Sequence, residues 1–366
     1  MIRKTVLAIT LAAAAAVPAL ANAQAAAPTL EKVLEASGLS LSGYIDAGYT
    51  HANRNVETGF STRVFDSQNN SFALHQVGVQ IAKQPKEGFG GLVNITAGSH
   101  ALAIHSFNTT SESQFDVTQA FGQYASGIMT LMAGKFVTLQ GTEVIWSPTN
   151  PNFSRSILFG AIPFTHTGVR SVWAFSDKFS FTAGLNNGWD QVKDSNSGKT
   201  LELGTTFTPI KPLTIAASYY TGKETVPQAT PGNPEGKRTS LNAVATYTVS
   251  DPLTLGAEFL SVSQENFGPI KAKYSGQAFY VTYMITPKWR AAGRFESFKD
   301  DDGFRYGTAA TKYKEFTLTG AYLPNASFEV RAELRRDNAD NAVFVETGGA
   351  VSKTLMTYAL QALYKF

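Results

Sequence analysis

Alternation of apolar and charged side chains with a period of two residues constrains this chain more than any other feature. The clearest case is the segment 328–335 (FEVRAELR), in which every second side chain is apolar and every other one is charged. Residues 288–296 (KWRAAGRFE) repeat the arrangement. Side chains of a β-strand point to alternate faces, so each segment predicts a strand with one apolar and one ionic face.

Prolines divide the second half of the chain into units of similar length. Four prolines are spaced 35 to 40 residues apart along the chain, and each of them interrupts an alternating run. Proline ends strands and pre-sets turns. A unit of this length holds two strands, one tight turn and one longer polar loop, which is typical of bacterial outer-membrane barrels. The prolines are Pro212, Pro252, Pro287 and Pro324.

Aromatic residues collect on the apolar face near the predicted tight turns. Amphipathic rings prefer the boundary between membrane and water, so they predict a girdle in contact with outer-membrane lipid. In a soluble sandwich the same rings would instead fill a core between two sheets. The near absence of charge on one face favours the barrel. The girdle residues are Phe175, Phe179, Phe207, Tyr247, Trp289, Tyr322, Phe328 and Phe366.

The expected fold class is therefore all-β, a transmembrane antiparallel up-and-down β-barrel of about sixteen strands. Only a closed barrel leaves no unpaired backbone in lipid, and an even strand number places both chain ends on one side. Fourteen or eighteen strands stay open, because the alternation before Phe164 is the least regular. Beyond the first two dozen residues no run reaches the roughly 18 apolar residues of a membrane-spanning helix, which excludes a helical membrane protein.

The chain begins with the features of a secretory signal peptide. Two basic residues precede an apolar run at 6–20, and Ala21 and Ala23 are small residues at the cleavage positions. We expect residues 1–23 to be removed during export. For residues 24–38 a short periplasmic helix and a disordered tail are both open, and the barrel is expected to occupy 39–366.

The last predicted strand continues the alternation until the chain stops at Phe366. This ending resembles that of outer-membrane barrels, whose terminal aromatic residue is read by the barrel-insertion machinery. The resemblance implies that machinery as a partner and the bacterial cell outer membrane as the location.

The segment 138–163 is the longest interruption between predicted strands. Long irregular segments in compact folds are usually functional. Its apolar residues predict that it folds into the barrel and narrows the pore, and a surface loop is the alternative. A sixteen-stranded barrel is wide enough to leave an aqueous channel, so passive diffusion of small hydrophilic solutes and ions is the expected function.

Around this segment the sequence resembles a known family. Residues 152–170 (NFSRSILFGAIPFTHTGVR), with 133–136 (AGKF) before them and 187–190 (NGWD) after them, are similar to the OmpL-like family of beta-barrel porins. The opening residues 41–46 (LSGYID) are similar as well. The resemblance implies an outer-membrane channel of Gram-negative bacteria without naming a solute. Among such porins homotrimers are common, so the resemblance also suggests that assembly.

Charged residues on the polar faces of the predicted strands are the candidates for the pore wall. Similar numbers of each sign predict weak ion selectivity overall. The arginines of two nearby strands could form a basic ladder opposite Glu143, but pairing with the interleaved acidic residues is the interpretation that the spacing favours. The pore-lining candidates are Glu143, Arg155, Arg170, Arg290, Arg294, Glu296, Glu329, Arg331, Glu333 and Arg335.

Other classes of function lack the residues they need. An enzyme needs a nucleophile or an activated water near a histidine, and the five histidines fall in no recognisable triad, so we expect no catalytic residues. Without cysteine or zinc-spaced histidines we expect no metal and no cofactor. A formal net charge of +3 predicts no nucleic-acid partner. A substrate-selective channel for sugars or small organic acids, and a surface adhesin or structural barrel, remain alternatives to a general porin.

Overall fold

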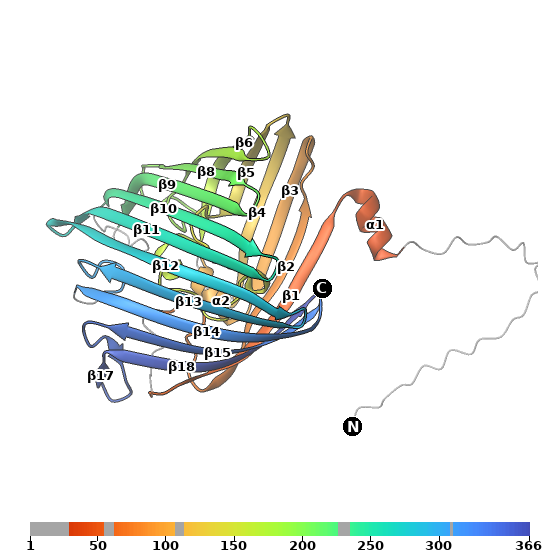
Figure 1. Ribbon diagram of the computed structural model, residues 1–366. Helices are drawn as coiled ribbons and strands as arrows, with labels where there is room; N and C mark the ends of the chain where they lie inside the picture. The colour runs from red at the N-terminus through yellow and green to blue at the C-terminus, as the bar shows by residue number, and fades with distance from the viewer. Residues whose placement is uncertain (1–28, 55–61, 107–112, 226–234, 308–309) are drawn as a thin grey trace, which may run out of the picture.

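Sixteen antiparallel strands, β1 to β15 and β18, close into a barrel in the computed structural model (Figure 1). The structure describes residues 29–54, 62–106, 113–225, 235–307 and 310–366, so the predicted signal peptide lies outside the described residues. The predicted fold class and strand number are confirmed, and all sixteen segments pair with their neighbours in sequence order. No helix among the described residues is long and apolar enough to cross a membrane.

The first half of the barrel contains most of the long connections. Its elements are α1 (Leu30–Ser37), β1 (Ser40–Ala52), β2 (Ser71–Lys83), β3 (Gly88–Ala97), α2 (Ser99–Ile104), β4 (Phe115–Ser126), β5 (Met129–Val137), the 3-10 turns η1 (Ser147–Thr149) and η2 (Phe159–Ala161), β6 (Thr165–Ala174), β7 (Phe179–Asn186) and β8 (Thr200–Ile210).

The second half consists mainly of long hairpins. Its strands are β9 (Leu213–Thr225), β10 (Glu235–Ser250), β11 (Leu253–Phe267), β12 (Ile270–Thr286), β13 (Trp289–Asp300), β14 (Thr311–Asn325), β15 (Phe328–Ala339) and β18 (Thr354–Lys365), with a small separate hairpin of β16 (Phe344–Val345) and β17 (Val351–Ser352).

The long connections lie at one end of the barrel and short turns join the strands at the other, with one exception: the two-residue turn 268–269 between β11 and β12 lies at the end of the long connections. The turns at 127–128, 211–212, 251–252 and 287–288 are two residues long and lie at the end that also carries α1 and the C-terminus (Figure 1). We call this the turn end and the opposite one the loop end. Helix α1 is capped at its start by Thr29, whose hydroxyl accepts a hydrogen bond from the amide of Lys32, and at its end by Gly38 in the left-handed region (φ 66°).

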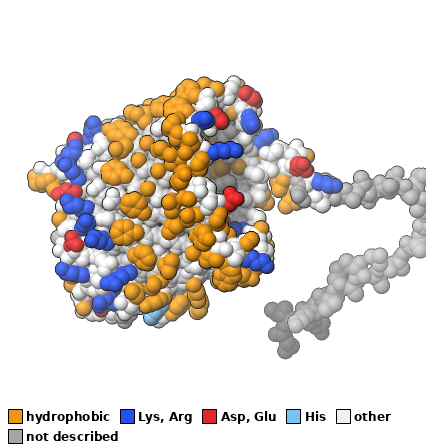
Figure 2. All heavy atoms as spheres, viewed as in Figure 1, with side chains coloured by type: hydrophobic (Ala, Val, Ile, Leu, Met, Phe, Trp, Pro, Cys, Tyr) orange, Lys and Arg blue, Asp and Glu red, His pale blue; other side chains and the backbone are white. Residues whose placement is uncertain are grey.

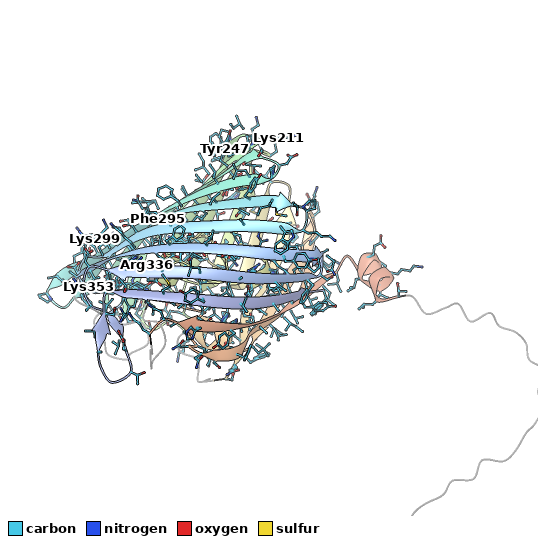
Figure 3. The ribbon with its side chains drawn as sticks, turned by 60° about the horizontal axis from the view of Figure 1, so that its bottom comes forward. Lys211, Tyr247, Phe295, Lys299, Arg336 and Lys353 are labelled. Carbon is cyan, nitrogen blue, oxygen red and sulfur yellow. The ribbon has the colours of Figure 1, made fainter. Side chains whose placement is uncertain are left out.

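The strands bury polar side chains and expose apolar ones. In β14 the side chains of Glu315 and Thr317 are buried, whereas Phe316 and Leu318 are each 50% exposed. Such a pattern is the reverse of a water-soluble sheet, and it gives the barrel an apolar outside and a polar inside. Figure 2 shows hydrophobic side chains across the wall and basic ones gathered at the loop end. On β13, Phe295 lies midway along the outer face and Lys299 lies nearer that end (Figure 3).

Gly134 allows β4 and β5 to pair closely. Its φ of 136° lies in a region that side-chain-bearing residues rarely adopt, and a Cβ there would overlap the carbonyl oxygen of Ala120 and Cα of Phe121. We expect Gly134→Ala to lower the free energy of unfolding by about 2 kcal/mol or more. Denaturant titration of detergent-solubilised protein measures this. Gly122→Ala on the facing strand is the control, since a Cβ at that position would meet nothing within 4 Å, and equal losses would contradict the explanation.

Candidate functional site

The segment 138–163 is buried among the inward side chains of the barrel. Arg155 is 1% exposed and binds its own segment: its Nε donates to the carbonyl of Val144 at 3.0 Å and its Nη1 to that of Phe153 at 2.8 Å. Burial at the centre of the segment lowers the pKa of the Arg155 guanidinium. Arg155 therefore fixes the shape of the segment.

Carboxylates of the barrel wall bind the backbone of this segment. Glu333 accepts from the amides of Phe153 and Ser154 at 2.7 and 2.9 Å. In the same way Glu296 accepts from the amides of residues 157 and 158 at 2.6 and 3.1 Å. An irregular segment has N–H groups without strand partners, and buried ones need acceptors. These two acids therefore hold the segment, and among the described residues no ion pair within 4.0 Å joins either of them to an arginine.

The strand arginines among the predicted pore-lining residues are paired with other acids. Arg294 contacts Glu143 at 2.7 Å and Glu315 at 3.0 Å, so Glu143 lies against the arginines and not across open space from them. These contacts neutralise the basic ladder that the sequence allowed. The remaining pairs of these arginines are Arg170 with Glu202, Arg290 and Arg331 with Glu329, and Arg335 with Asp337 and Glu315.

Arg63 is a buried cation that is not among the sequence candidates. Arg63, from the connection between β1 and β2, contacts Asp66 and lies 2.5 Å from Asp337. The Arg63 charge lowers the pKa of the Asp66 carboxyl against the opposing effect of its burial. Its partner Asp337 is 274 positions away in the chain, so no local sequence signal could reveal the pair.

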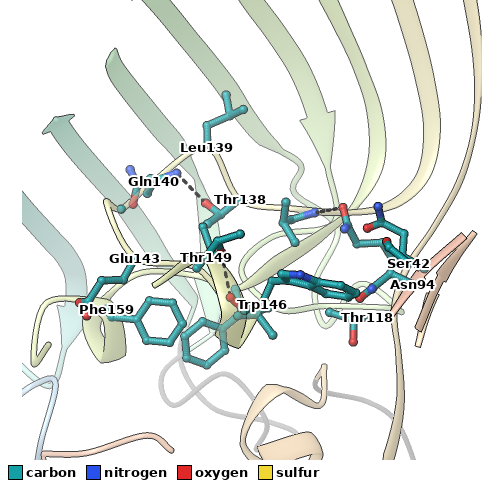
Figure 4. Close-up of a pocket in the computed structure, with 17 residues that line it drawn as sticks. Ser42, Asn94, Thr118, Thr138, Leu139, Gln140, Glu143, Trp146, Thr149 and Phe159 are labelled. Carbon is teal, nitrogen blue, oxygen red and sulfur yellow. Dashed lines mark hydrogen bonds between the residues drawn. The ribbon is translucent and has the colours of Figure 1, made fainter. Parts of the chain in front are cut away.

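A cavity of about 560 Å³ remains on the side of the barrel formed by β1 to β5 (Figure 4). Trp146, Phe159 and Phe164 line it from the segment side. Its one acidic lining residue, Glu143, is already paired with Arg294. We call it the inner cavity. Its hydroxyl and amide side chains include Ser42, Gln80, Asn94, Thr118, Gln119 and Gln140.

A second cavity, of about 540 Å³, opens near the loop end between α2, the β7–β8 connection and the β13–β14 connection. We call it the outer cavity. Phe164 lines both cavities. Its ring stacks on Phe159 at 5.0 Å and lies 6.5 Å from Phe65. We call these three packed phenyl rings the aromatic partition; within it Phe164 borders both cavities and Phe159 borders the inner one.

Helix α2 packs against the aromatic partition through His100, which is 3% exposed. Its ring stacks on Phe65 at 4.5 Å and on His75 at 4.7 Å, and His75 lies 3.5 Å from Asp46. Burial lowers the pKa of His100 to about 3. His100 is therefore neutral at pH 7, and its stacking is that of an uncharged ring.

Acidification is expected to weaken this packing. The folded pKa of His100 lies below its unfolded value of 6.5, so the unfolded chain takes up the proton first and stability falls as the pH drops below 6.5. At pH 5 the loss is roughly 2 kcal/mol. We expect the melting temperature of His100→Phe, measured by circular dichroism, to fall less between pH 7 and pH 5 than that of the unmodified protein. Equal falls would contradict the role of His100.

The residues predicted to form a girdle all lie toward the turn end with exposed side chains. They range from Phe328 and Tyr322, each 37% exposed, to Phe175 at 56%. Trp289 and Tyr322 face each other across β13 and β14, with ring centroids 4.7 Å apart.

Comparison with known proteins gives one family and several solved structures. The family model described as Putative beta-barrel porin-2, OmpL-like, matches residues 38–366. A loop L8 deletion mutant of OmpT, an outer membrane protein of Vibrio cholerae, has a similar fold, with a TM-score of 0.62 and 12% identity over 90% of this chain and 99% of that one. No curated protein matches.

Two further solved structures are similar over a comparable length. The outer membrane channel DcaP of Acinetobacter baumannii has a TM-score of 0.61 and 14% identity, covering 90% of this chain and 97% of its own. An anion-selective porin from Comamonas acidovorans has a TM-score of 0.62 and 9% identity, covering 90% and 99%. At such low identities the likeness concerns the fold alone.

Proposed function

The chain belongs to the OmpL-like family of beta-barrel porins, and on that premise we propose that solutes cross its barrel along the wall that the segment 138–163 leaves uncovered. The protein is a porin of the bacterial outer membrane, a channel for small hydrophilic solutes. The route runs from the inner cavity past the aromatic partition to the outer cavity. The observation that carries the proposal is the polar interior of a closed barrel whose apolar side chains face outward.

Ion pairing within the wall supports weak selectivity between simple ions. The arginines at the segment contacts each have a carboxylate within reach, so little net field is left at the segment for a passing ion. In this proposal Glu143, Arg155, Glu296 and Glu333 fix the constriction by holding the segment. The exposed aromatic residues at the turn end form a girdle in lipid.

Planar-bilayer recording of the purified mature chain tests this proposal. We expect discrete current steps in KCl and a small reversal potential across a salt gradient. Heat-denatured protein at the same concentration is the control. Absence of steps above that control would overturn the channel, and a strong preference for one ion would overturn the balanced wall.

The proposal also covers the oligomeric state of the protein and the absence of catalysis. OmpT of Vibrio cholerae is known in a trimer form, and this supports a homotrimer here. Light scattering of the detergent-solubilised protein measures the assembly, and a monomer mass would contradict it. The proposal includes no catalytic step, and hydrolase assays on the same preparation test that part.

A further inference from the structure

Arg238, on β10 near the loop end, is a buried cation that forms no ion pair with any carboxylate of the described residues. Its side chain is 2% exposed, and its Nε donates to the amide oxygen of Gln264 at 2.6 Å. Its Nη2 is buried and has no hydrogen-bond partner in the part of the chain that the structure describes. Within the described residues no carboxylate lies within 4.0 Å of the guanidinium, unlike the paired arginines of the wall. A buried charge left this way is costly unless something else binds it.

Two aromatic rings hold this guanidinium in place. Its central carbon lies 5.0 Å from the ring centroid of Trp189 and 5.3 Å from that of Phe304. Cation–π contacts stabilise the charge at the ring faces and leave the N–H groups available in the guanidinium plane. The two rings therefore fix the orientation of the Arg238 side chain, while part of its hydrogen-bonding capacity stays unused.

Arg238 lines the outer cavity together with aromatic side chains and a second cation. Tyr274, Phe267 and Phe304 supply ring surface, and Arg305 adds a positive charge whose Nε donates to the carbonyl of Gly160 at 2.7 Å. With about 540 Å³, the cavity falls in the range of small-molecule sites.

The nearby carboxylates are occupied by other partners. Asp190, which lines the cavity, accepts from the backbone amides of Phe164 and Thr165 at 2.7 and 2.9 Å. Glu224 accepts from the amide of Trp189 at 3.3 Å and from the hydroxyl of Thr200 at 2.7 Å. Neither one satisfies the free nitrogen of Arg238.

We propose that the outer cavity binds an aromatic carboxylate, with the carboxylate on Arg238 and the ring among the aromatic side chains. A guanidinium fork matches the geometry of a carboxylate, and the charge-assisted bonds would satisfy Nη2. Arg305, which lines the same cavity, adds electrostatic attraction. This inference rests on the proposed function and gives the channel a class of preferred solute, the small aromatic acids.

Isothermal titration of the detergent-solubilised mature protein with sodium benzoate tests the site. We expect benzoate to bind at least tenfold more tightly than benzamide, which lacks the charge, and than acetate, which lacks the ring. Arg238→Gln is expected to weaken benzoate binding at least tenfold. The matched control is Arg336→Gln, which removes the same charge from the exposed face of β15 (Figure 3).

A second variant and a comparison of ligands distinguish the ways in which this proposal could fail. Should Arg238→Gln not fold, Arg305→Gln is the second variant, with an expected loss of about threefold. Equal binding of benzoate and benzamide, or benzoate binding that neither variant weakens, would overturn the site. Isothermal titration measures binding independently of conductance. A protein that conducts but does not bind benzoate therefore refutes this site alone. A protein that binds benzoate but does not conduct refutes the proposed channel alone.

Discussion

Replacing Phe164 with alanine is expected to raise the single-channel conductance roughly threefold or more. The ring of Phe164 lines both cavities and stacks on Phe159, so its removal joins the two cavities through a gap of phenyl size. A constriction made of apolar rings resists wetting, and a shorter side chain lowers that resistance. Bilayer recordings in KCl measure the effect.

The matched control for this variant removes the same ring from the outside of the barrel. Phe295 is 44% exposed on the outer face of β13 (Figure 3). Phe295→Ala is expected to leave the conductance unchanged. If Phe164→Ala also conducts like the unmodified protein, the aromatic partition does not limit the current.

Loss of Arg294 is expected to have the largest effect on stability. Its guanidinium is buried between Glu143 and Glu315, at 2.7 and 3.0 Å, and also donates to the carbonyl of Ser154 at 2.8 Å. Arg294→Ala leaves two carboxylates buried without their cation, and breaking such a pair typically costs about 3 to 5 kcal/mol, so we expect a loss of that size. Equilibrium unfolding in denaturant measures it.

An exposed ion pair at the loop end of β13 is the control that separates the effect of burial from the effect of charge. Lys299 pairs with Asp301 at the loop end, where both groups meet solvent. Lys299→Ala is expected to leave the unfolding midpoint unchanged within error, because exposed pairs contribute little. Comparable losses in both variants would show that the number of pairs, and not their burial, sets the stability.

Strands could be predicted from the sequence because their signal is local. The polarity of each residue in 328–335 indicates on which face of the strand its side chain lies. In the structure β15 buries Glu329, Arg331 and Glu333 and exposes Phe328 and Val330. A closed barrel follows once the strands are counted, because every strand pairs with its neighbour in the chain or closes the ring.

The interior could not be predicted in the same way. Glu296 and Glu333 look like partners for the arginines beside them, yet they bind backbone amides 139 and 180 positions away. Arg238 looks like an ordinary residue at the start of a strand, and only the rings of Trp189 and Phe304 distinguish it. Contacts between a folded-in segment and a wall depend on three-dimensional fit, which leaves no periodic trace in the sequence.

The ring closes between the first and the last strand, with Tyr44 opposite Lys365 and Gly43 exchanging backbone hydrogen bonds with Phe366. A sheet that has not yet closed therefore carries two unsatisfied strand edges, one at β1 and one at the strand added most recently, until β18 pairs with β1. Such edges invite pairing with other extended polypeptides. An assisting protein that pairs one of its own strands with an open edge would protect the growing sheet. The final strand of the barrel would then displace it, one residue pair at a time.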